Sequence, residues 1–409
     1  MPHHFFDIAV ITLLSSLVAI VFSKLKQLPM IGYVLAGVII GPYFLQIIES
    51  EEDIRFLAEM GVVLLLFILG MELPLKSFRE SYKAAVPATF LLIVLSIVGV
   101  FVIAQNFDLS TQQKIVYGFI VSLSSTAVAV KLLENIGLMK KGTGQIAISV
   151  LIAQDILFVP MIITVNALGS SGGFDLWFVP KIIVAIGGLI GLITFLSKKE
   201  KVHLPFADTI KRHNELIPVA ALSWCFVGAG LSEYIGLSPA YGAFLAGLVV
   251  GNSHSKERVL PRIEPMQSVL LMVFFLSIGM LIDFKVIADN LPLITLLLIG
   301  TMVFKTIVCV ALLKTFLPKD RWRCSFVTGV TLSQIGEFSF ILAAAALSNG
   351  IFNEESYKVV IAVIALNLSF SPLWVMILHK FVQISFIEKS ASVMNQALKQ
   401  LLIFNKQKA

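Results

Sequence analysis

Charged residues and cysteine are both scarce in this chain. Asp, Glu, Lys and Arg together make up 14% of the 409 residues, and the three cysteines are Cys225, Cys309 and Cys324. Soluble proteins carry about 25% charged residues, so the shortage excludes a soluble enzyme and a nucleic-acid-binding protein. The odd number and wide spacing of the cysteines exclude a disulfide scaffold and a zinc motif. Because 57% of the residues are apolar, most of the surface is expected to face lipid.

Apolar segments long enough to cross a bilayer follow one another along almost the whole chain. A hydrocarbon core of about 30 Å needs roughly 20 apolar residues per helix. This criterion predicts thirteen spans: 5–23, 29–48, 54–71, 84–105, 113–133, 146–168, 176–197, 214–233, 237–252, 266–283, 290–313, 324–348 and 357–385. No Lys or Arg precedes the first span, so we expect a retained helix rather than a signal peptide. The predicted fold class is an all-α integral membrane protein.

Lys and Arg are distributed unevenly between the two sides of the predicted membrane domain. The loops after odd-numbered spans hold 20 of these residues, and the loops after even-numbered spans hold 5. Positive charge is retained on the cytoplasmic side. We therefore expect an N-terminus outside, a cytoplasmic C-terminus and a multi-pass location in a plasma membrane, the inner membrane of a bacterium.

The sequence repeats itself at a nearly constant offset. Residues 32–41 resemble 242–251 at an offset of 210, whereas 70–71 match 279–280 and 121–124 match 330–333 at an offset of 209. The offset equals seven spans, and an odd shift inverts the topology. We therefore predict a first repeat over 5–168, a linker helix over 176–197 and a second repeat over 214–385. Inverted repeats of secondary transporters place the substrate near the midplane, between discontinuous helices; a purely architectural repeat is the alternative.

Polar residues interrupt spans five and twelve at related positions. The first interruption contains Ser124, Ser125 and Thr126, and the second contains Ser333, Gln334 and Gly336. Hydroxyl groups that bond back to the preceding turn could produce a mere bend. The repetition favours unwound helices, which lipid tolerates only where the free backbone groups line a cavity or bind an ion.

Three ionisable residues lie deep within spans: Asp155, Lys305 and Glu337. A charge inside a membrane costs at least about 2.5–3.5 kcal/mol and indicates function by default. A structural ion pair of Lys305 with Glu337 is an alternative, as is a structural carboxylate at Asp155. Glu72 and Asp283 lie at span ends, where solvated caps are expected.

Desolvation gives the buried carboxylate its predicted chemistry. Asp155 is expected to hold either a proton or a dehydrated monovalent cation, but not both, because a second positive charge has no partner there. A proton entering from one side would then displace the cation. Gln154, Ser124, Ser125 and Thr126 are candidates for the neutral oxygens around the cation. Lys305 is expected to pair with Asp155 when the site is empty.

Seven short motifs occur in order between about residues 5 and 385. They are the Gly-Tyr-Val-Leu-Ala-Gly…Gly-Pro of 32–42, the Leu-Leu-Phe-Ile-Leu-Gly-Met-Glu-Leu of 65–73, the polar segment 122–127, the Gln-Asp-Ile of 154–156, the Gly-Ala-Phe-Leu-Ala-Gly of 242–247, the Ile-Glu-Pro of 263–265 and the Gln-Ile-Gly-Glu-Phe of 334–338. Together they resemble the transmembrane domain of Kef-type monovalent cation/proton antiporters.

This resemblance implies a sodium/proton-antiporter-like fold with two crossed discontinuous helices, spans five and twelve. Spans 1–3 and 8–10 would form the scaffold of a homodimer, and spans 4–6 and 11–13 would form an ion-carrying core that moves as an elevator. The ion-binding aspartate of the family falls on Asp155 and its core lysine on Lys305. The transported ions would be K⁺ or Na⁺ and H⁺, and no cofactor is expected.

The chain departs from the family pattern in two places. Sodium antiporters of this fold often carry two adjacent acidic residues where this chain has Gln154-Asp155, so electroneutral exchange and a preference for K⁺ are expected. Kef proteins usually continue into a nucleotide-binding regulatory domain. Here only a short cytoplasmic tail, 386–409, follows the last span, so regulation by such a domain is not expected within the chain, and a separate regulatory subunit is conceivable.

Three other functional classes compete with antiport. A ligand-gated potassium channel would need a carbonyl filter, and no Thr-Val-Gly-Tyr-Gly-like segment is present. An intramembrane hydrolase would need a histidine near the buried serines, but the histidines all lie near span ends or in loops. A small-anion symporter on a similar inverted-repeat fold stays open.

Overall fold

A computed structural model describes most of the chain. The described residues are 4–25, 29–46, 52–72, 75–135, 142–169, 178–198, 201–203, 213–235, 237–280, 282, 284–316, 322–371, 373–375 and 377–378. The predicted tail 386–409 lies outside these residues, as do Asp283 and the last part of the predicted span 357–385.

The regular structure of the described residues is helical, apart from one isolated bridge between Val202 and Ser253. The first half contains α1 (His4–Lys24), α2 (Pro29–Ile40), α3 (Glu52–Glu72), α4 (Leu75–Ile103), the 3-10 turn η1 (Ala104–Asn106), α5 (Thr111–Ser122), α6 (Thr126–Asn135), α7 (Gly142–Gly169) and α8 (Phe178–Lys198). The second half contains α10 (Leu216–Tyr234), α11 (Pro239–Gly251), α12 (Lys256–Met280), α13 (Phe284–Asp289), α14 (Leu291–Phe316), α15 (Trp322–Thr331) and α16 (Phe338–Ser348). A further helix over 354–371, called the last helix below, follows α16.

Length and composition identify five stretches of helix that can cross a membrane within the described residues. They are Ala85–Ile103, Ile146–Gly169, Leu216–Tyr234, Lys256–Met280 and Leu291–Thr315. Helices also occupy the other predicted spans, including shorter apolar helices such as α2, α11 and α16. The number of thirteen crossings stays a prediction.

Several helix ends differ from the predicted spans. α12 begins at Lys256 and α4 at Leu75, about ten residues before the apolar segments of these helices. Residues 253–265, which lie between two predicted spans, are therefore mostly helical. Hydropathy detects only the part of a helix that faces lipid. By contrast, α2 ends at Ile40 rather than at residue 48, because Gly41-Pro42 follows and proline disfavours continuation of the helix.

Close contacts at glycine obey the offset of the sequence repeat. A Cβ atom added to Gly37 of α2 would collide with the carbonyl oxygen of Leu276 in α12, and one added to Gly247 of α11 would collide with that of Phe67 in α3. Here 247 − 37 = 210 and 276 − 67 = 209, as in the sequence. Three more pairs of glycine contacts are related by the same offsets. They are Gly279–Val34 with Gly70–Phe244, Gly41–Met280 with Gly251–Met71, and Gly32–Ala19 with Gly242–Gly228. Hence α2 packs on α12 as α11 packs on α3.

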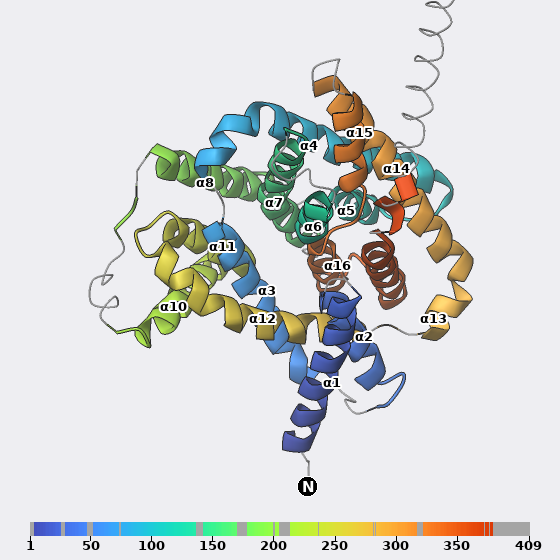
Figure 1. Ribbon diagram of the computed structural model, residues 1–409, viewed down its shortest axis with the longest axis horizontal. Coiled ribbons are helices and arrows are strands. Elements are labelled where there is room, and N and C mark those ends of the chain that lie inside the picture. Colours follow the sequence, from blue (N-terminus) through green and yellow to red (C-terminus); the bar gives the residue numbers. More distant parts are fainter. Residues whose placement is uncertain are drawn as a thin grey trace, which may run out of the picture.

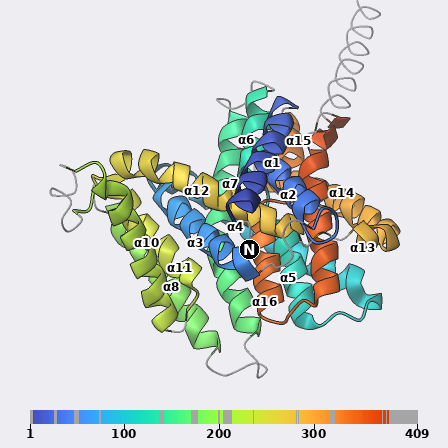
Figure 2. The ribbon, with the colours of Figure 1, turned by 90° about the horizontal axis from the view of Figure 1, so that it is seen from below.

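The described helices form two bundles joined by α8. The first bundle consists of α1, α2, α3, α10, α11 and α12; the second consists of α4, α5, α6, α7, α14, α15, α16 and the last helix. Among the labelled helices, extensive backbone contacts occur within each bundle, and α8 contacts α11 of the first bundle as well as α4 and α7 of the second. Figures 1 and 2 show α10, α11, α3 and α12 side by side, beside the group that contains α4 to α7 and α14 to α16.

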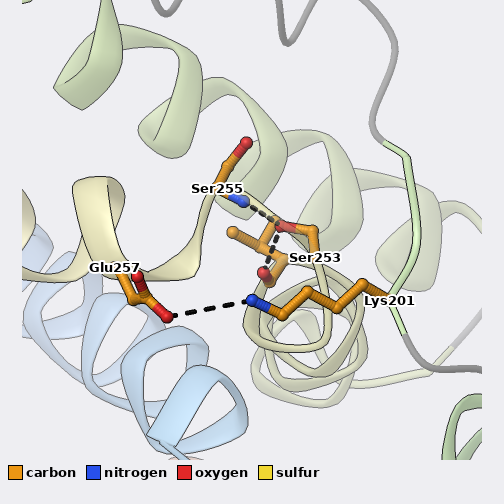
Figure 3. A network of polar contacts seen from close by, with 5 residues as sticks. Lys201, Ser253, Ser255 and Glu257 are labelled. Atoms are coloured by element: carbon orange, nitrogen blue, oxygen red, sulfur yellow. Dashed lines mark hydrogen bonds and ion pairs between the residues drawn. The ribbon is translucent and has the colours of Figure 1, made fainter.

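The segment after α8 is attached to the loop between α11 and α12. Val202 N donates to Asn252 O at 2.9 Å, and Asn252 Nδ2 donates to Leu196 O at 3.0 Å. In Figure 3, Lys201 reaches across this connection to Glu257 in the first turn of α12, at 3.8 Å. The linker helix is therefore fastened to the first bundle at this end.

The glycine contacts give a test of the packing. Gly37→Ala and Gly247→Ala should each lower the free energy of unfolding by about 1–3 kcal/mol, because the added methyl group meets backbone that cannot rotate away. The thermal unfolding midpoint of the purified protein measures this effect. Gly300→Ala on α14 is the control, since nothing lies within 4 Å of its Cβ position; an equal loss there would contradict the argument.

Candidate ion-binding site

The first interruption separates α5 from α6. α5 ends at Ser122 and α6 begins at Thr126, and the residues between them are not helical. Gln154 of α7 replaces the missing helical hydrogen bonds: its Oε1 accepts from Ser124 N at 3.2 Å, and its Nε2 donates to Ser122 O at 3.1 Å. Buried backbone groups need such partners, so Gln154 stabilises the unwound segment.

The second interruption separates α15 from α16. α15 ends at Thr331 and α16 begins at Phe338. Here Asn367 of the last helix takes the corresponding task, because its Oδ1 accepts from Ile335 N at 2.8 Å. The sequence analysis missed Asn367, which is fully buried. An amide side chain in span thirteen, the repeat of the span that holds Gln154, could have indicated it.

The two interruptions lie directly against one another. Gly336 N donates to Leu123 O at 3.1 Å, Ser124 Oγ donates to Leu332 O at 2.7 Å, and Gln334 Nε2 donates to Ser125 O at 3.2 Å. A Cβ atom on Gly336 would lie 2.7 Å from the carbonyl carbon and oxygen of Ser124. Only glycine permits this approach of the two backbones.

Lys305 of α14 joins both interruptions and is fully buried. Its Nζ donates to Leu123 O, to Gln334 O at 2.8 Å and to Ser124 Oγ at 3.1 Å. Three acceptors match the three N–H groups of a charged ammonium. In this conformation neutral oxygens occupy the donors of Lys305, and no ion pair within 4.0 Å joins Lys305 to the described Asp155 or Glu337. The pairing with Asp155 in the empty site stays a prediction.

Asp155 of α7 is 8% exposed and lies at the start of α6. Thr126 Oγ1 is 3.3 Å from Oδ2 and 3.5 Å from Oδ1, so among the described residues the carboxylate has one weak hydroxyl partner. Of the predicted neutral ligands, Thr126 therefore contacts Asp155. Ser124 Oγ is occupied by Leu332 O, Gln154 Nε2 and Lys305 Nζ, and together with Gln154 it holds the interruption instead.

Two acceptor atoms of the second interruption have no hydrogen-bond partner. They are Gln334 Oε1 and Glu337 Oε2, two of only four such buried side-chain atoms in the described residues. Each unsatisfied buried acceptor costs about 1–3 kcal/mol. The Ser125 hydroxyl lies beside the Glu337 carboxyl group, and the next residue, Thr126, contacts Asp155. Both carboxyl groups therefore lie beside the Ser125–Thr126 segment.

The remaining predicted residues take secondary positions. Ser333 lies in the second interruption and donates to Val330 O at 2.7 Å. Glu72 ends α3 and is exposed, as expected. His203 and His254 lie in loops with ring centroids 4.9 Å apart, and the described part of the chain holds no group of three His, Cys, Asp or Glu that fits a metal ion.

A helical membrane protein whose buried carboxyl groups meet between two broken helices belongs to the class of ion-transporting membrane proteins. The family model of the sodium/hydrogen exchanger transmembrane domain matches residues 10–380. The chain belongs to this family, whose members are transporters and antiporters rather than enzymes.

Curated relatives cover most of the chain. The iron transporter MagA of Paramagnetospirillum magneticum is 36% identical over 93% of this chain and 86% of its own length. The K⁺ efflux antiporter 5 of Arabidopsis thaliana is 31% identical over 90% of this chain, and the glutathione-regulated potassium-efflux protein KefC of Salmonella heidelberg is 30% identical over 86%. The chain spans 65% and 56% of the lengths of these two relatives. These names support the resemblance to a Kef-type transmembrane domain.

A solved structure has a similar fold. The sodium proton antiporter MjNhaP1 of Methanocaldococcus jannaschii superposes with a TM-score of 0.67 over 91% of this chain and 97% of that chain, at 17% identity. The all-α membrane fold resembling that of a sodium/proton antiporter is thereby confirmed.

Replacement of Lys305 tests its place in the site. Lys305→Ala should lower the thermal unfolding midpoint strongly, because Leu123 O and Gln334 O lose a charged donor in a buried place. Lys198→Ala, at an exposed position of α8, is the matched control and should change little. A variant that unfolds normally but no longer moves ions would instead assign Lys305 to coupling.

Proposed function

We propose that the protein exchanges a monovalent cation for protons across the membrane and that both ions occupy Asp155 in turn. The observation that carries this proposal is a buried carboxylate with one weak hydroxyl partner, beside the meeting point of two interrupted helices. Such a carboxylate needs one positive charge, and either a proton or a dehydrated cation supplies it.

Thr126 supplies the first neutral oxygen of the proposed cation shell. It is the first residue of α6, and the N-terminal end of a helix carries a partial positive charge that stabilises a nearby carboxylate. Gln154, Ser124 and Ser125 act in the proposal by keeping the backbone of the first interruption open beside Asp155. Loss of their hydrogen bonds would misplace Thr126 relative to the carboxylate.

Alternating access is proposed to occur by an elevator movement of the second bundle against the first. Glycine contacts join helices of the first bundle backbone to backbone, whereas larger side chains such as Phe275 and Phe340 meet between the bundles, with ring centroids 5.8 Å apart. The first bundle then serves as the scaffold of a homodimer and the second as the ion-carrying core, in thirteen crossings with inverted repeats. An N-terminus outside, a bacterial inner membrane and a separate regulatory subunit belong to the same proposal.

We propose K⁺ as the exchanged cation. The names of the relatives include iron and potassium, and the family name includes sodium. The oxygen atoms of Asp155 and Thr126 are ligands that suit a hard cation. A single acidic residue at positions 154–155 suits exchange of one proton per cation, which is electroneutral.

Asp155→Asn tests the central residue. Cation-dependent proton movement in everted vesicles should be lost, because an amide neither binds a proton nor neutralises a cation, while the unfolding profile stays close to that of the native protein. Asp108→Asn, at an exposed loop position, should keep full exchange. Undiminished exchange by Asp155→Asn would remove this residue from the mechanism.

A panel of ions tests the cargo. Proteoliposomes with a proton gradient should show saturable exchange with K⁺ and Rb⁺, weaker exchange with Na⁺ and Li⁺, and the same rates with and without a valinomycin clamp of the membrane potential. Fe²⁺ under reducing conditions is included because of the iron transporter among the relatives. Exchange of Fe²⁺ alone would overturn the monovalent assignment, and uptake that does not saturate would indicate a channel.

A further inference from the structure

The unpartnered oxygens of the second interruption are the starting observation. Gln334 is fully buried, and its Oε1 atom has no hydrogen-bond partner although its Nε2 atom donates to Ser125 O at 3.2 Å. The Oε2 atom of Glu337 is also buried and also has no hydrogen-bond partner. The other two buried atoms without partners, Ser15 Oγ and Ser96 Oγ, are hydroxyl groups of α1 and α4. Within the described residues, the unpartnered amide oxygen and the unpartnered carboxyl oxygen thus both belong to the second interruption.

Gln334 and Glu337 lie beside the same short segment, Ser125–Thr126, as Asp155. Gln334 bonds the backbone of Ser125, the Ser125 hydroxyl lies beside Glu337, and the next residue, Thr126, contacts Asp155. Gln334, Glu337 and Asp155 are therefore linked through the Ser125–Thr126 segment.

The chemistry of the orphan atoms defines what can occupy the space. An amide oxygen and an ionised carboxylate oxygen only accept, so the space beside them suits a cation, a proton on the carboxylate or a hydrogen-bond donor such as water. Oxygen donors of this kind bind hard cations. The nearest buried cation, Lys305, has all three N–H groups engaged with other oxygens and cannot serve both atoms.

Charge counting gives the same answer. The buried site contains two carboxyl groups and one ammonium, so with both carboxyl groups ionised it lacks one positive charge. The ends of the broken helices leave this balance unchanged, because two C-terminal ends and two N-terminal ends contribute opposite partial charges. One monovalent cation or one proton makes the site neutral.

We propose that Gln334 and Glu337 form a second subsite for the exchanged ion, coupled to Asp155 across the Ser125–Thr126 segment. This proposal rests on the proposed function and extends it. Glu337 balances the charge of Lys305, so the carrier with bound cation and the carrier with bound proton are both neutral. Either loaded form then crosses the membrane interior without a net charge, which desolvation would penalise.

Cation protection of the wild-type protein tests the subsite without any substitution. Dicyclohexylcarbodiimide modifies protonated carboxyl groups in apolar surroundings, and mass spectrometry of peptides measures modification at each residue. Saturating KCl or RbCl, compared with choline chloride at equal ionic strength, should reduce modification of both Asp155 and Glu337. Protection of Asp155 with unchanged modification of Glu337 would overturn the subsite.

Substitution provides the second measurement. Glu337→Gln should raise the cation concentration for half-maximal thermal stabilisation and the KM for exchange by at least about tenfold, and it should shift the pH profile of exchange. Glu337→Asp should partly restore both values, whereas Glu355→Gln, exposed at the start of the last helix, should resemble the wild type. An unchanged KM and pH profile for Glu337→Gln would overturn the proposal.

The two proposals fail separately. If wild-type proteoliposomes show no exchange while KCl still protects Glu337, the proposed function is wrong and the subsite stands. If exchange is present and Asp155 is protected while Glu337 is not, the subsite is wrong and antiport stands.

Discussion

The hydrogen bonds of one buried ammonium hold the two interruptions together. Lys305 donates to carbonyl oxygens that follow the C-terminal ends of α5 and α15, at Leu123 and Gln334. Each helix end carries about half an elementary charge, so one lysine neutralises the negative ends of both half-helices. Without it, the buried carbonyl groups of Leu123 and Gln334 would each lose a charged donor, although Leu123 O would keep the N–H of Gly336. The position of Thr126, and hence of the oxygens around Asp155, depends on this bridge.

The carboxyl groups occupy the opposite ends of the same broken helices. Asp155 contacts Thr126, the first residue of α6, and Glu337 immediately precedes α16. Negative groups thus lie at both N-terminal ends and the positive group lies at both C-terminal ends, as the helix dipole favours. Two half-helices crossing at their interruptions are the simplest arrangement that brings four such ends to one place. The exchange of a cation and a proton then requires no other charged group in this region.

The sequence predicted the all-α membrane fold, because hydropathy and small-residue motifs are local patterns. The predicted repeat agrees with the offset of the glycine contacts, and the ion-binding role of the site stays a prediction. The sequence did not predict which polar residue does what. Ser124 and Gln154 were grouped with Thr126 as ligands, yet their hydrogen bonds are used to hold the unwound backbone. Asn367 was missed because its partner, Ile335 N, lies 32 residues away. The carbonyl acceptors of Lys305 were not predicted, because backbone acceptors cannot be recognised in a sequence. A hydropathy pattern does not detect polar extensions of helices, such as the first turns of α12.

The difference between contacts inside the first bundle and contacts between the bundles bears on movement. Inside the first bundle, glycines bring backbones together, and a shift of one helix along its neighbour would drive a Cβ atom or carbonyl into a collision. Between the bundles, side chains such as Phe275 and Phe340 keep the backbones apart. At the edge, Lys358 Nζ of the last helix donates to Tyr43 Oη, in the turn after α2, at 2.8 Å. An apolar interface with a polar contact at its edge slides more readily than interlocked backbone, because packed side chains can exchange neighbours without breaking buried hydrogen bonds. In the proposed mechanism both loaded forms are neutral, which lowers the electrostatic cost of the same movement. The packing and the charge count thus both support the proposed elevator movement.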